Sequence, residues 1–329
     1  MIKKSLFLAV LSVASLGLVS CNGGSTGDPA DGNRIQVGAM NGPTMIGLAR
    51  LDAQSKVGET QNEYTFAKEG TPDGITAGLL NGSYDAAAVP ANNASVLFNK
   101  GGVSLKVAAI NTLNVLYLVE NGNTITSLAD LSGKTVYSPG KGSTPEYVFK
   151  HLLEANNIKD VNVQFVSEGT EIVQGLKQGT MNIGLLPQPA ATSAIMGSET
   201  IGIRMDLATE WKRLPGNENK EIVTGVLVVR DDYLVNNKGT FNTFLDEYKA
   251  SATFMTDAIN IDVAAQYVVD LEIIPALPVA KAALPLCNVT FIEGDDMKTK
   301  LGDYLEILHS QNPASIGGEL PGNGFYYSR

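Results

Sequence analysis

The sequence predicts an α/β protein with two lobes, each a mainly parallel β-sheet flanked by helices. Three observations support this fold class. About 300 residues follow Gly32, which is too many for one small hydrophobic core and suits two. A strand–loop–helix pattern occurs twice along the chain. In the later part of each unit, the second copy follows the first at a constant spacing of 97 residues, as from Ile75 to Ile172. Two such βαβα units predict two parallel-sheet lobes.

Residues 1–20 are expected to be a signal peptide. Lys3 and Lys4 supply positive charge, and residues 5–20 carry no charge. This apolar run is shorter than the roughly 20 apolar residues of a membrane span, and polar sequence follows it at once. The stretch Leu18-Val19-Ser20-Cys21 is similar to a bacterial lipobox, which is cut before a cysteine whose thiol is then diacylated. The alternative is an ordinary secretory signal followed by an incidental cysteine.

Residues 21–32 predict a lipidated, flexible tether. They are rich in Gly, Ser, Asp and Pro and contain no large apolar residue. Two acyl chains on Cys21 would hold the protein durably on a membrane. Cys287 would then be the single thiol of the processed chain, so no intrachain disulfide is expected. We interpret Cys287 as a small buried hydrophobic residue.

The first half of each repeated unit is a strand that ends in a loop and leads into a helix. Residues 35–40 read as a strand, residues 41–44 (NGPT) as its loop, and Met45 begins an apolar period of three to four residues. In the second unit, residues 134–137 read as a strand and residues 138–144 (SPGKGST) as its loop. Pro145 then occupies a position that a first helical turn tolerates.

The second half of each unit also matches its counterpart. Residues 66–71 (FAKEGT) correspond to residues 165–170 (FVSEGT). Each copy continues as a helix that ends at a glycine, Gly82 or Gly179, followed by a short buried strand. A loop led by proline then opens the next helix, at residues 90–93 and 187–190.

Four strand-to-helix loops are the candidate ligand site, at 41–44, 91–95, 141–145 and 188–192. In open α/β sheets, ligands bind beyond the carboxyl ends of the strands. Each loop ends at a helix start, where free N–H groups and the positive end of the helix dipole are available. If the lobes face one another, these helix starts meet at one cleft.

The chain is expected to cross between the lobes twice. Residues 107–113 and 115–119 read as strands that leave the first lobe, and residues 222–229 read as a buried strand that returns to it. The crossings would form a two-strand hinge between lobe 1 (33–112 and 226–329) and lobe 2 (113–225). Helical segments in the last third of the chain are interpreted as packing and lid elements; they are residues 241–256, 263–271 and 297–310.

The candidate ligand-binding residues are the polar and small residues of these loops and of one strand end. They are Asn41, Gly42, Pro43, Thr44, Asn92, Asn93, Asn111, Thr112, Gly142, Ser143, Thr144 and Gln188. The alternative for the polar residues at helix starts is simple capping of the first N–H groups. Lys141 is the one cation inside a candidate loop, and a lysine there is more often solvated. Arg204 is a weaker candidate, and Trp211 and Tyr117 are more often core residues than stacking partners.

Several classes of function find no support in the sequence. A net charge of −10 argues against a nucleic acid as partner. His151 and His309 are the two histidines, no H-x-x-x-H or cysteine cluster occurs, and we expect neither a metal nor a cofactor. The acidic pairs Asp231-Asp232 and Asp295-Asp296 read as solvated turn residues. The Walker spacing and the G-x-S-x-G elbow are also absent, so no catalytic residue is assigned.

Taken together, these segments resemble the type 2 periplasmic binding proteins of the sulfonate, taurine, nitrate and thiamine-precursor branch. The segments that carry the resemblance are the lipobox, the loop 42–44, residues 79–87 (LLNGSYDAA), residues 131–136 (LSGKTV) before the loop 140–144, and residues 226–230 (VLVVR). The likeness spans essentially the whole processed chain. The ending, residues 313–321 and 325–327, is similar to endings in a subgroup of such lipoproteins.

The resemblance implies a Venus-flytrap fold, an ABC permease as partner and a ligand held between the lobes. Ligand identity does not carry over, because branch members hold anions or flat heterocycles with different side chains. A relative of this fold makes a pyrimidine with its own histidine and cysteine groups. One cysteine and two histidines in the processed chain do not support that chemistry.

The sequence therefore favours a substrate-binding lipoprotein of an ABC importer, monomeric, anchored at the cell envelope and facing the periplasm or the outside. It would bind a small polar or anionic molecule reversibly by lobe closure. Two alternatives remain open: a lipid-anchored enzyme of the same fold, and a sensory or adhesive surface lipoprotein. A different transport specificity is a third, although an amino-acid site would normally supply an arginine and an acidic group, and the loops do not hold both.

Overall fold

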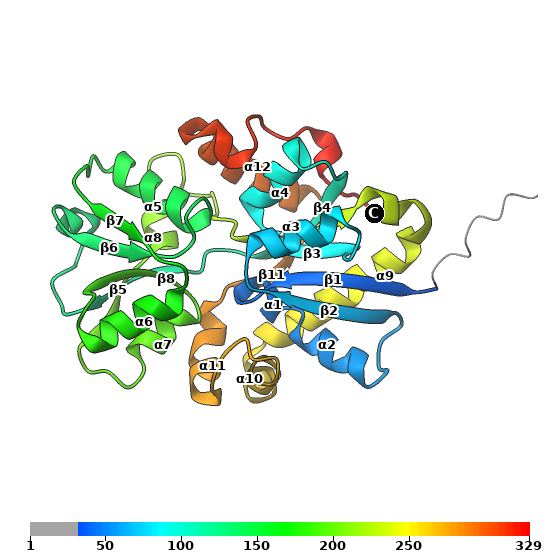
Figure 1. Ribbon diagram of the computed structural model, residues 1–329, viewed down its shortest axis with the longest axis horizontal. Helices are drawn as coiled ribbons and strands as arrows, with labels where there is room; N and C mark the ends of the chain where they lie inside the picture. The colour runs from blue at the N-terminus through cyan, green and yellow to red at the C-terminus, as the bar shows by residue number, and fades with distance from the viewer. Residues whose placement is uncertain (1–31) are drawn as a thin grey trace, which may run out of the picture. The chain divides into compact units, whose positions relative to one another are not determined.

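The computed structural model describes residues 32–329, in which two β-sheets each carry helices on both faces (Figure 1). Both sheets belong to one unit, residues 33–329. The predicted signal peptide (1–20), Cys21 and the tether up to residue 31 lie outside the described residues. Among the described helices, none is both long enough and apolar enough to cross a membrane.

Sheet A is built from two distant parts of the chain. Its strands run in the order β11-β4-β10-β3-β1-β2. Their bounds are β1 (Arg34–Met40), β2 (Glu63–Glu69), β3 (Ala86–Pro90), β4 (Leu105–Thr112), β10 (Gly225–Arg230) and β11 (Val289–Ile292). β1 pairs in parallel with β2 and β3, whereas β10 lies antiparallel between β3 and β4.

Sheet B repeats this plan. Its order is β7-β6-β8-β5-β9, with β5 (Leu116–Asn121), β6 (Thr135–Ser138), β7 (Asn162–Phe165), β8 (Ile183–Pro187) and β9 (Ile201–Asp206). β6 pairs in parallel with β7 and β8, and β5 lies antiparallel between β8 and β9. The α/β fold class is confirmed. Sheet B contains one reversed strand, β5, and sheet A contains two, β10 and β11. In each sheet, β10 or β5 is the first strand after the chain enters that sheet from the other.

The internal duplication is visible in the positions of the elements. β3 begins at Ala86 and β8 at Ile183, so their starts are 183 − 86 = 97 residues apart. Helices α3 (Pro72–Leu80) and α6 (Gly169–Gln178) also begin 169 − 72 = 97 residues apart. Local sequence explains the shared geometry. Thr71 caps α3 by accepting from the Gly74 N–H, and Gly179 ends α6 in the left-handed conformation.

Alternating side chains of the central strands enter two different hydrophobic cores. In β3, Ala86 and Ala88 belong to one core, and Ala87 and Val89 belong to the other. A strand that is buried on both faces reads as a continuous apolar run rather than an alternating one, as residues 86–89 do.

The remaining helices cover the sheets. Those beside sheet A are α1 (Pro43–Ile46), α2 (Ala49–Lys56), α4 (Ala91–Lys100), α9 (Asp231–Thr256), α10 (Ile261–Asp270), α11 (Leu277–Ala283) and α12 (Gly294–Gln311). Those beside sheet B are α5 (Thr144–Ala155), α7 (Ala190–Ile195) and α8 (Leu207–Lys212). Short 3₁₀ turns are η1 (Leu128–Leu131), η2 (Ala258–Asn260), η3 (Leu284–Leu286), η4 (Pro313–Ile316) and η5 (Asn323–Phe325).

Two helices differ from their predicted extents. The helical period that starts at Met45 is divided into α1 and α2 at Gly47 and Leu48. A Cβ at position 47 would lie 3.1 Å from both Tyr248 and Val289, so the small residue lets the chain pack closely there. The helix expected at 241–256 begins ten residues earlier, at Asp231, and contains a kink at Asn237.

The two crossings between the sheets run side by side. The chain leaves β4 at Thr112 and enters β5 at Leu116, and it returns to β10 through residues 213–224. The Thr224 N–H donates to the Thr112 carbonyl at 3.0 Å. One hydrophobic core is continuous across both sheets and includes Trp211 of α8 and Tyr304 of α12.

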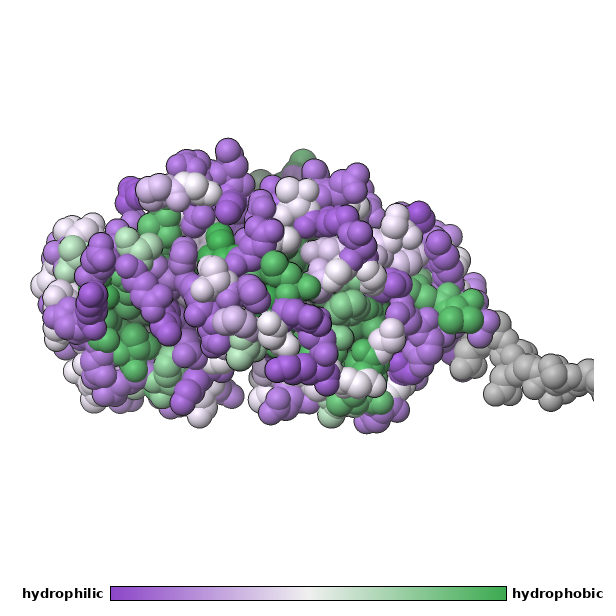
Figure 2. All heavy atoms as spheres, turned by 90° about the horizontal axis from the view of Figure 1, so that it is seen from above, coloured by the Kyte–Doolittle hydropathy of each residue, from purple (hydrophilic) through white to green (hydrophobic). Residues whose placement is uncertain are grey.

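The end of the chain packs on sheet A. The Tyr327 N–H donates to the Val107 carbonyl of β4 at 2.8 Å. The Ser95 hydroxyl and the Asn99 amide of α4 both donate to the Ile316 carbonyl, at 2.8 and 2.9 Å. Hydrophilic residues predominate on the face seen in Figure 2, and hydrophobic ones are scattered among them.

Candidate functional site

Loops that follow strands of the two sheets contact one another. The Asn92 Nδ2, at the start of α4, donates to the Gly142 carbonyl at 3.4 Å. The Tyr304 hydroxyl of α12 donates to the Thr144 Oγ1 at 3.4 Å. Both contacts join sheet A and its helices to the loop between β6 and α5. The carboxyl ends of β3 and β6 therefore meet at one region between the sheets, which we call the junction.

Asn92 is a polar side chain buried in the junction. It is 1% exposed. Its Nδ2 donates a second hydrogen bond, to the Ser315 carbonyl at 3.3 Å. Both partners are carbonyl oxygens, which only accept, so the orientation of the amide is determined and the Oδ1 is identified. This Oδ1 is buried and has no partner among the described residues.

Gln188 is the corresponding buried amide of sheet B. It is fully buried, and its Oε1 accepts from the Thr192 N–H at 3.3 Å and from the Thr192 hydroxyl at 2.8 Å. A backbone N–H only donates, so this amide orientation is also determined. The Nε2 of Gln188 is left without a partner in the described part of the chain.

Backbone hydrogen bonds place Gln188 close to the crossings. The Gln188 N–H donates to the Val115 carbonyl at 2.9 Å, and the Thr224 N–H donates to Thr112, three residues before Val115. The Thr224 carbonyl accepts from the Ala91 N–H at 3.0 Å, next to Asn92. The buried Thr224 Oγ1 is a third polar atom without a partner in residues 32–329. Asn92, Thr224 and Gln188 thus lie along one short path of backbone contacts.

Asn111 lies in the part of the site that belongs to sheet A. Its Nδ2 donates to the Thr44 carbonyl at 3.2 Å, and its Oδ1 is buried with no partner in the described structure. The buried Tyr248 hydroxyl is another such atom; burial raises the pKa of Tyr248, and the neighbouring Asn111 amide partly opposes this. Gly225 makes the packing possible, because a Cβ there would lie 2.5 Å from the Asn111 Oδ1.

Other predicted residues shape the loops through bonds to the backbone. The Thr44 hydroxyl donates to the Met40 carbonyl at 3.0 Å, and the Thr112 hydroxyl donates to the Pro43 carbonyl at 3.5 Å. These bonds occupy both hydroxyl protons. Gly42 has a φ of 118°, a conformation that favours glycine.

The loop before α5 is held by its own polar groups. Gly140 and Gly142 have φ values of 75° and 76°, in the left-handed region. The Ser143 hydroxyl donates to the Gly140 carbonyl at 2.8 Å. The Gly142 N–H donates to the Glu146 Oε2 at 2.6 Å, so a carboxylate of the protein already occupies this donor.

The capping interpretation applies to Gln188, and there only to one end of its amide. The N-cap positions of α1, α4, α5 and α7 are Gly42, Pro90, Ser143 and Pro189, and none makes a side-chain capping bond. Asn92 bonds to distant carbonyls instead. Gln188 does satisfy the Thr192 N–H near the start of α7, but only with one end of its amide.

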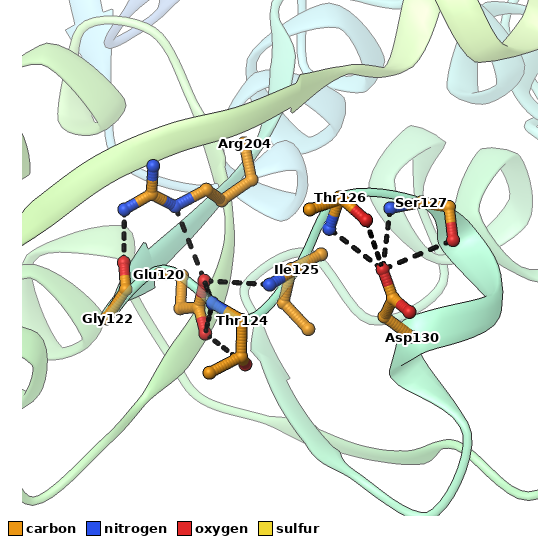
Figure 3. Close-up of polar contacts among 8 residues, drawn as sticks. All are labelled: Glu120, Gly122, Thr124, Ile125, Thr126, Ser127, Asp130 and Arg204. Atoms are coloured by element: carbon orange, nitrogen blue, oxygen red, sulfur yellow. Dashed lines mark hydrogen bonds and ion pairs between the residues drawn. The ribbon is translucent and has the colours of Figure 1, made fainter.

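Some candidates lie apart from these contacts. Asn41 and Lys141 are exposed, and Asn93 is half-buried. Arg204 is committed elsewhere: its Nε lies 3.3 Å from the Glu120 Oε2, and it also donates to the Gly122 carbonyl (Figure 3). Glu120 and Gly122 lie at the end of β5 away from its start at the crossing, so this cation does not reach the junction.

The aromatic candidates are core residues. Trp211 is fully buried and packs between His151 and Tyr304, with ring centroids 5.0 and 6.1 Å away. Tyr117 is 6% exposed, and its hydroxyl donates to the Leu286 carbonyl at 3.2 Å. Burial raises the pKa of Tyr117 to about 12. Cys287 is fully buried, and burial raises the pKa of its thiol to about 12.

The acidic pairs serve local structure. Asp231 accepts from the Ser104 hydroxyl at 2.5 Å, and Asp232 forms an ion pair with Arg230. Asp295 and Asp296 lie in the first turn of α12. Within residues 32–329, His, Cys, Asp and Glu side chains form no group of three that could hold a metal ion.

Sequence reasoning missed four residues that take part in the junction: Thr224, Glu146, Tyr304 and Ser315. Glu146 carried a usable signal, because an acidic residue is common in the first turn of a helix. Tyr304 and Ser315 come from the C-terminal segment, more than 150 residues away from the loop that they help to hold. Nothing local in the sequence indicates that approach.

The family model described as NMT1/THI5 like matches residues 66–258 of this chain. This match includes the second half of the first repeated unit and the whole of the second. No curated protein matches the sequence.

Solved structures extend the likeness to most of the chain. An ABC transporter protein from Parabacteroides distasonis is 21% identical, with a TM-score of 0.74 over 90% of this chain and 99% of that one. The periplasmic aliphatic sulphonate binding protein SsuA from Escherichia coli is 13% identical, with a TM-score of 0.70 over 92% and 93%. The periplasmic nitrate-binding protein NrtA from Synechocystis is 11% identical, with a TM-score of 0.64 over 86% and 82%. At these identities the likeness is one of fold.

Proposed function

This chain belongs to the NMT1/THI5-like family, and on that premise we propose that it is the substrate-binding lipoprotein of an ABC importer. It binds a small polar or anionic molecule reversibly between two lobes and presents it to a permease. Structures of the same fold include an ABC transporter protein and periplasmic binding proteins for sulphonate and nitrate. The observation that carries the proposal is the junction, where buried amides from both sheets have polar atoms without partners among residues 32–329.

In this proposal, lobe 1 is built around sheet A and lobe 2 around sheet B. Lobe 1 comprises residues 33–112 and 226–329, and lobe 2 comprises residues 113–225. The crossings next to Thr112 and Thr224 act as the hinge, supported by the backbone bond between them. A ligand that contacts both lobes favours the closed arrangement, provided that its affinity for that arrangement is higher.

Capture rather than catalysis is the proposed activity. The junction contains amides, hydroxyls and glycine-rich loops, none of which is a strong acid or base near neutral pH. The two histidines lie elsewhere: His151 packs on Trp211, and His309 is in the last turn of α12. Glu146 is committed to the Gly142 N–H. These assignments support a binding protein that leaves its ligand unchanged.

Small-angle X-ray scattering on residues 22–329 tests the mechanism. The protein is first examined by native mass spectrometry for a co-purified small molecule, which is then removed and added back. We expect the radius of gyration to fall when the compound is restored. Tight binding without compaction would contradict lobe closure, and chemical conversion of the compound would contradict a pure binding function.

A further inference from the structure

The unsatisfied atoms of the junction define which hydrogen-bonding groups a ligand must carry. On the sheet A side, Asn92 offers the acceptor Oδ1, because its Nδ2 is committed to the Gly142 and Ser315 carbonyls. On the sheet B side, Gln188 offers the donor Nε2, because its Oε1 is committed to Thr192. Leaving such buried groups unpaired is costly, and native proteins usually satisfy them.

Electrostatics at the junction disfavour a bare oxyanion. An oxyanion has only acceptors, so its oxygen atoms would face the Asn92 Oδ1 without a proton between them. Burial of an anion requires a compensating charge. Lys141, the one cation in the four loops, is exposed, and Arg204 is paired with Glu120. The Gly142 N–H, which could bind an anion near the start of α5, already binds Glu146.

We infer that the junction binds a small uncharged molecule that donates a hydrogen bond to Asn92 and accepts one from Gln188. A carboxamide, a urea or a lactam-type heterocycle has this combination of groups. The Thr224 hydroxyl, which both donates and accepts, lies between the two amides along the backbone path and suits a second polar group of the ligand. This inference rests on the proposed function and narrows its ligand from polar or anionic to uncharged.

The specificity is divided between the sheets. Sheet A supplies the acceptor, and sheet B supplies the donor. A molecule that satisfies one amide alone would leave the other buried and unpaired in the closed arrangement. Only a ligand that carries both a donor for Asn92 and an acceptor for Gln188 would therefore stabilise the closed arrangement. This requirement links ligand recognition to the lobe closure that the permease is proposed to detect.

The test begins with the chemical class of the bound molecule. The full chain, purified from its membrane in detergent, is incubated with the small-molecule fraction of a cell extract, washed and denatured, and the released compound is identified by accurate mass. We expect a compound that is uncharged at pH 7 and carries both a donor and an acceptor. Release of a sulfonate, nitrate or another oxyanion would overturn the inference and leave the proposed function intact. Release of no compound, together with no compaction in scattering, would overturn both.

Two variants then test the residues. Gln188→Leu removes the donor at similar volume, and we expect the affinity for the released compound to fall about tenfold or more. Asn92→Ala removes the acceptor and should have an effect of the same order. Gln174→Leu is the matched control, because Gln174 is an exposed glutamine of α6, a helix beside sheet B. This variant should bind the released compound with unchanged affinity. An unchanged affinity in a folded Gln188→Leu protein would show that the Gln188 amide does not bind the ligand, and the inference would be wrong.

Discussion

Glu120 illustrates how a single buried carboxylate can organise a turn. It is 3% exposed and ends the buried part of β5. Its oxygens accept from the Thr124 hydroxyl at 2.6 Å and from the N–H groups of Thr124 and Ile125, and Arg204 lies beside it (Figure 3). Burial opposes ionisation of Glu120, but these hydrogen bonds and the Arg204 charge outweigh it, so the pKa of Glu120 is lower than its ordinary value of 4.5.

The direction of this shift predicts acid sensitivity. Because the pKa of Glu120 is lower in the folded chain than in the unfolded one, its stabilisation is complete above the unfolded pKa and disappears as the pH falls through the folded pKa. Asp130 acts in the same direction: hydrogen bonds from Thr126 and Ser127 lower its pKa to about 2. We expect stability to decline between about pH 5 and pH 2, as measured by urea unfolding at a series of pH values.

Substitution of Glu120 measures how much this residue contributes to the loss of stability at low pH. Glu120→Gln keeps the shape but removes the charge, and we expect the free energy of unfolding at pH 7 to fall by about 1–3 kcal/mol. The variant should also lose less stability than the unmodified chain on acidification. Glu199→Gln, at an exposed position of the same half of the chain, is the control. An equal slope with pH in both proteins would exclude Glu120 as a source of the acid sensitivity.

At the scale of elements, α12 connects the two sheets. It belongs to the C-terminal segment that packs on sheet A, yet Tyr304 contacts Thr144 and Trp211 on the sheet B side. Burial raises the pKa of Tyr304, so its hydroxyl remains protonated and available as a donor. Together with the bond from Asn92 to Gly142, this contact holds the loop before α5 against sheet A.

Removal of the Tyr304 hydroxyl should loosen this connection. Tyr304→Phe retains the ring packing and loses one buried hydrogen bond, which contributes about 0.5–1.5 kcal/mol. We expect a larger radius of gyration for the ligand-free protein, measured by small-angle scattering. Tyr267→Phe, at a half-buried tyrosine of α10 that packs on Phe254, should leave it unchanged. If both variants match the unmodified chain, α12 does not restrain the two sheets.

At the scale of the whole molecule, the proposed anchor decides where the binding unit works. The unit that contains both sheets begins at residue 33, and the proposed lipid is attached at Cys21. The intervening residues are Gly-, Ser-, Asp- and Pro-rich, a composition typical of a flexible linker. We propose that these residues act as a flexible tether, which would let the unit turn toward a permease while it remains on the membrane.

Cys21→Ser tests the anchor. Without the thiol no diacyl group can be attached, and we expect the protein to lose lipid labelling and to leave the washed membrane fraction for the soluble fraction. Cys287→Ser serves as the comparison, since it changes the other cysteine, which is buried. Retention of Cys21→Ser in washed membranes would mean that another part of the chain holds the protein there.

The two-sheet α/β fold followed from the sequence because its causes are local and repeated. Apolar runs such as residues 86–89 and glycines at helix ends such as Gly179 depend only on neighbours along the chain. Their recurrence 97 residues later shows that the same unit occurs twice. The starts of the helices that follow buried strands were also identifiable from composition, but the loop expected at 91–95 is wrong: β3 ends at Pro90 and α4 begins at Ala91, so these residues form the first turns of the helix. By contrast, the break between α1 and α2 at Gly47 and Leu48 was not predicted, and Gly47 packs there close to Tyr248 and Val289, which are distant in the sequence.

Only the tertiary structure decided which atoms of the candidate site are available. Asn92 and Thr44 were both predicted as polar residues at helix starts. The Thr44 hydroxyl donates to the Met40 carbonyl, whereas the Asn92 Oδ1 has no partner in the described residues. The difference arises because Ser315 and Gly142 approach Asn92 from distant parts of the chain and determine its amide orientation. Hydrogen-bond satisfaction depends on which groups meet in space, and the order of residues alone does not specify that.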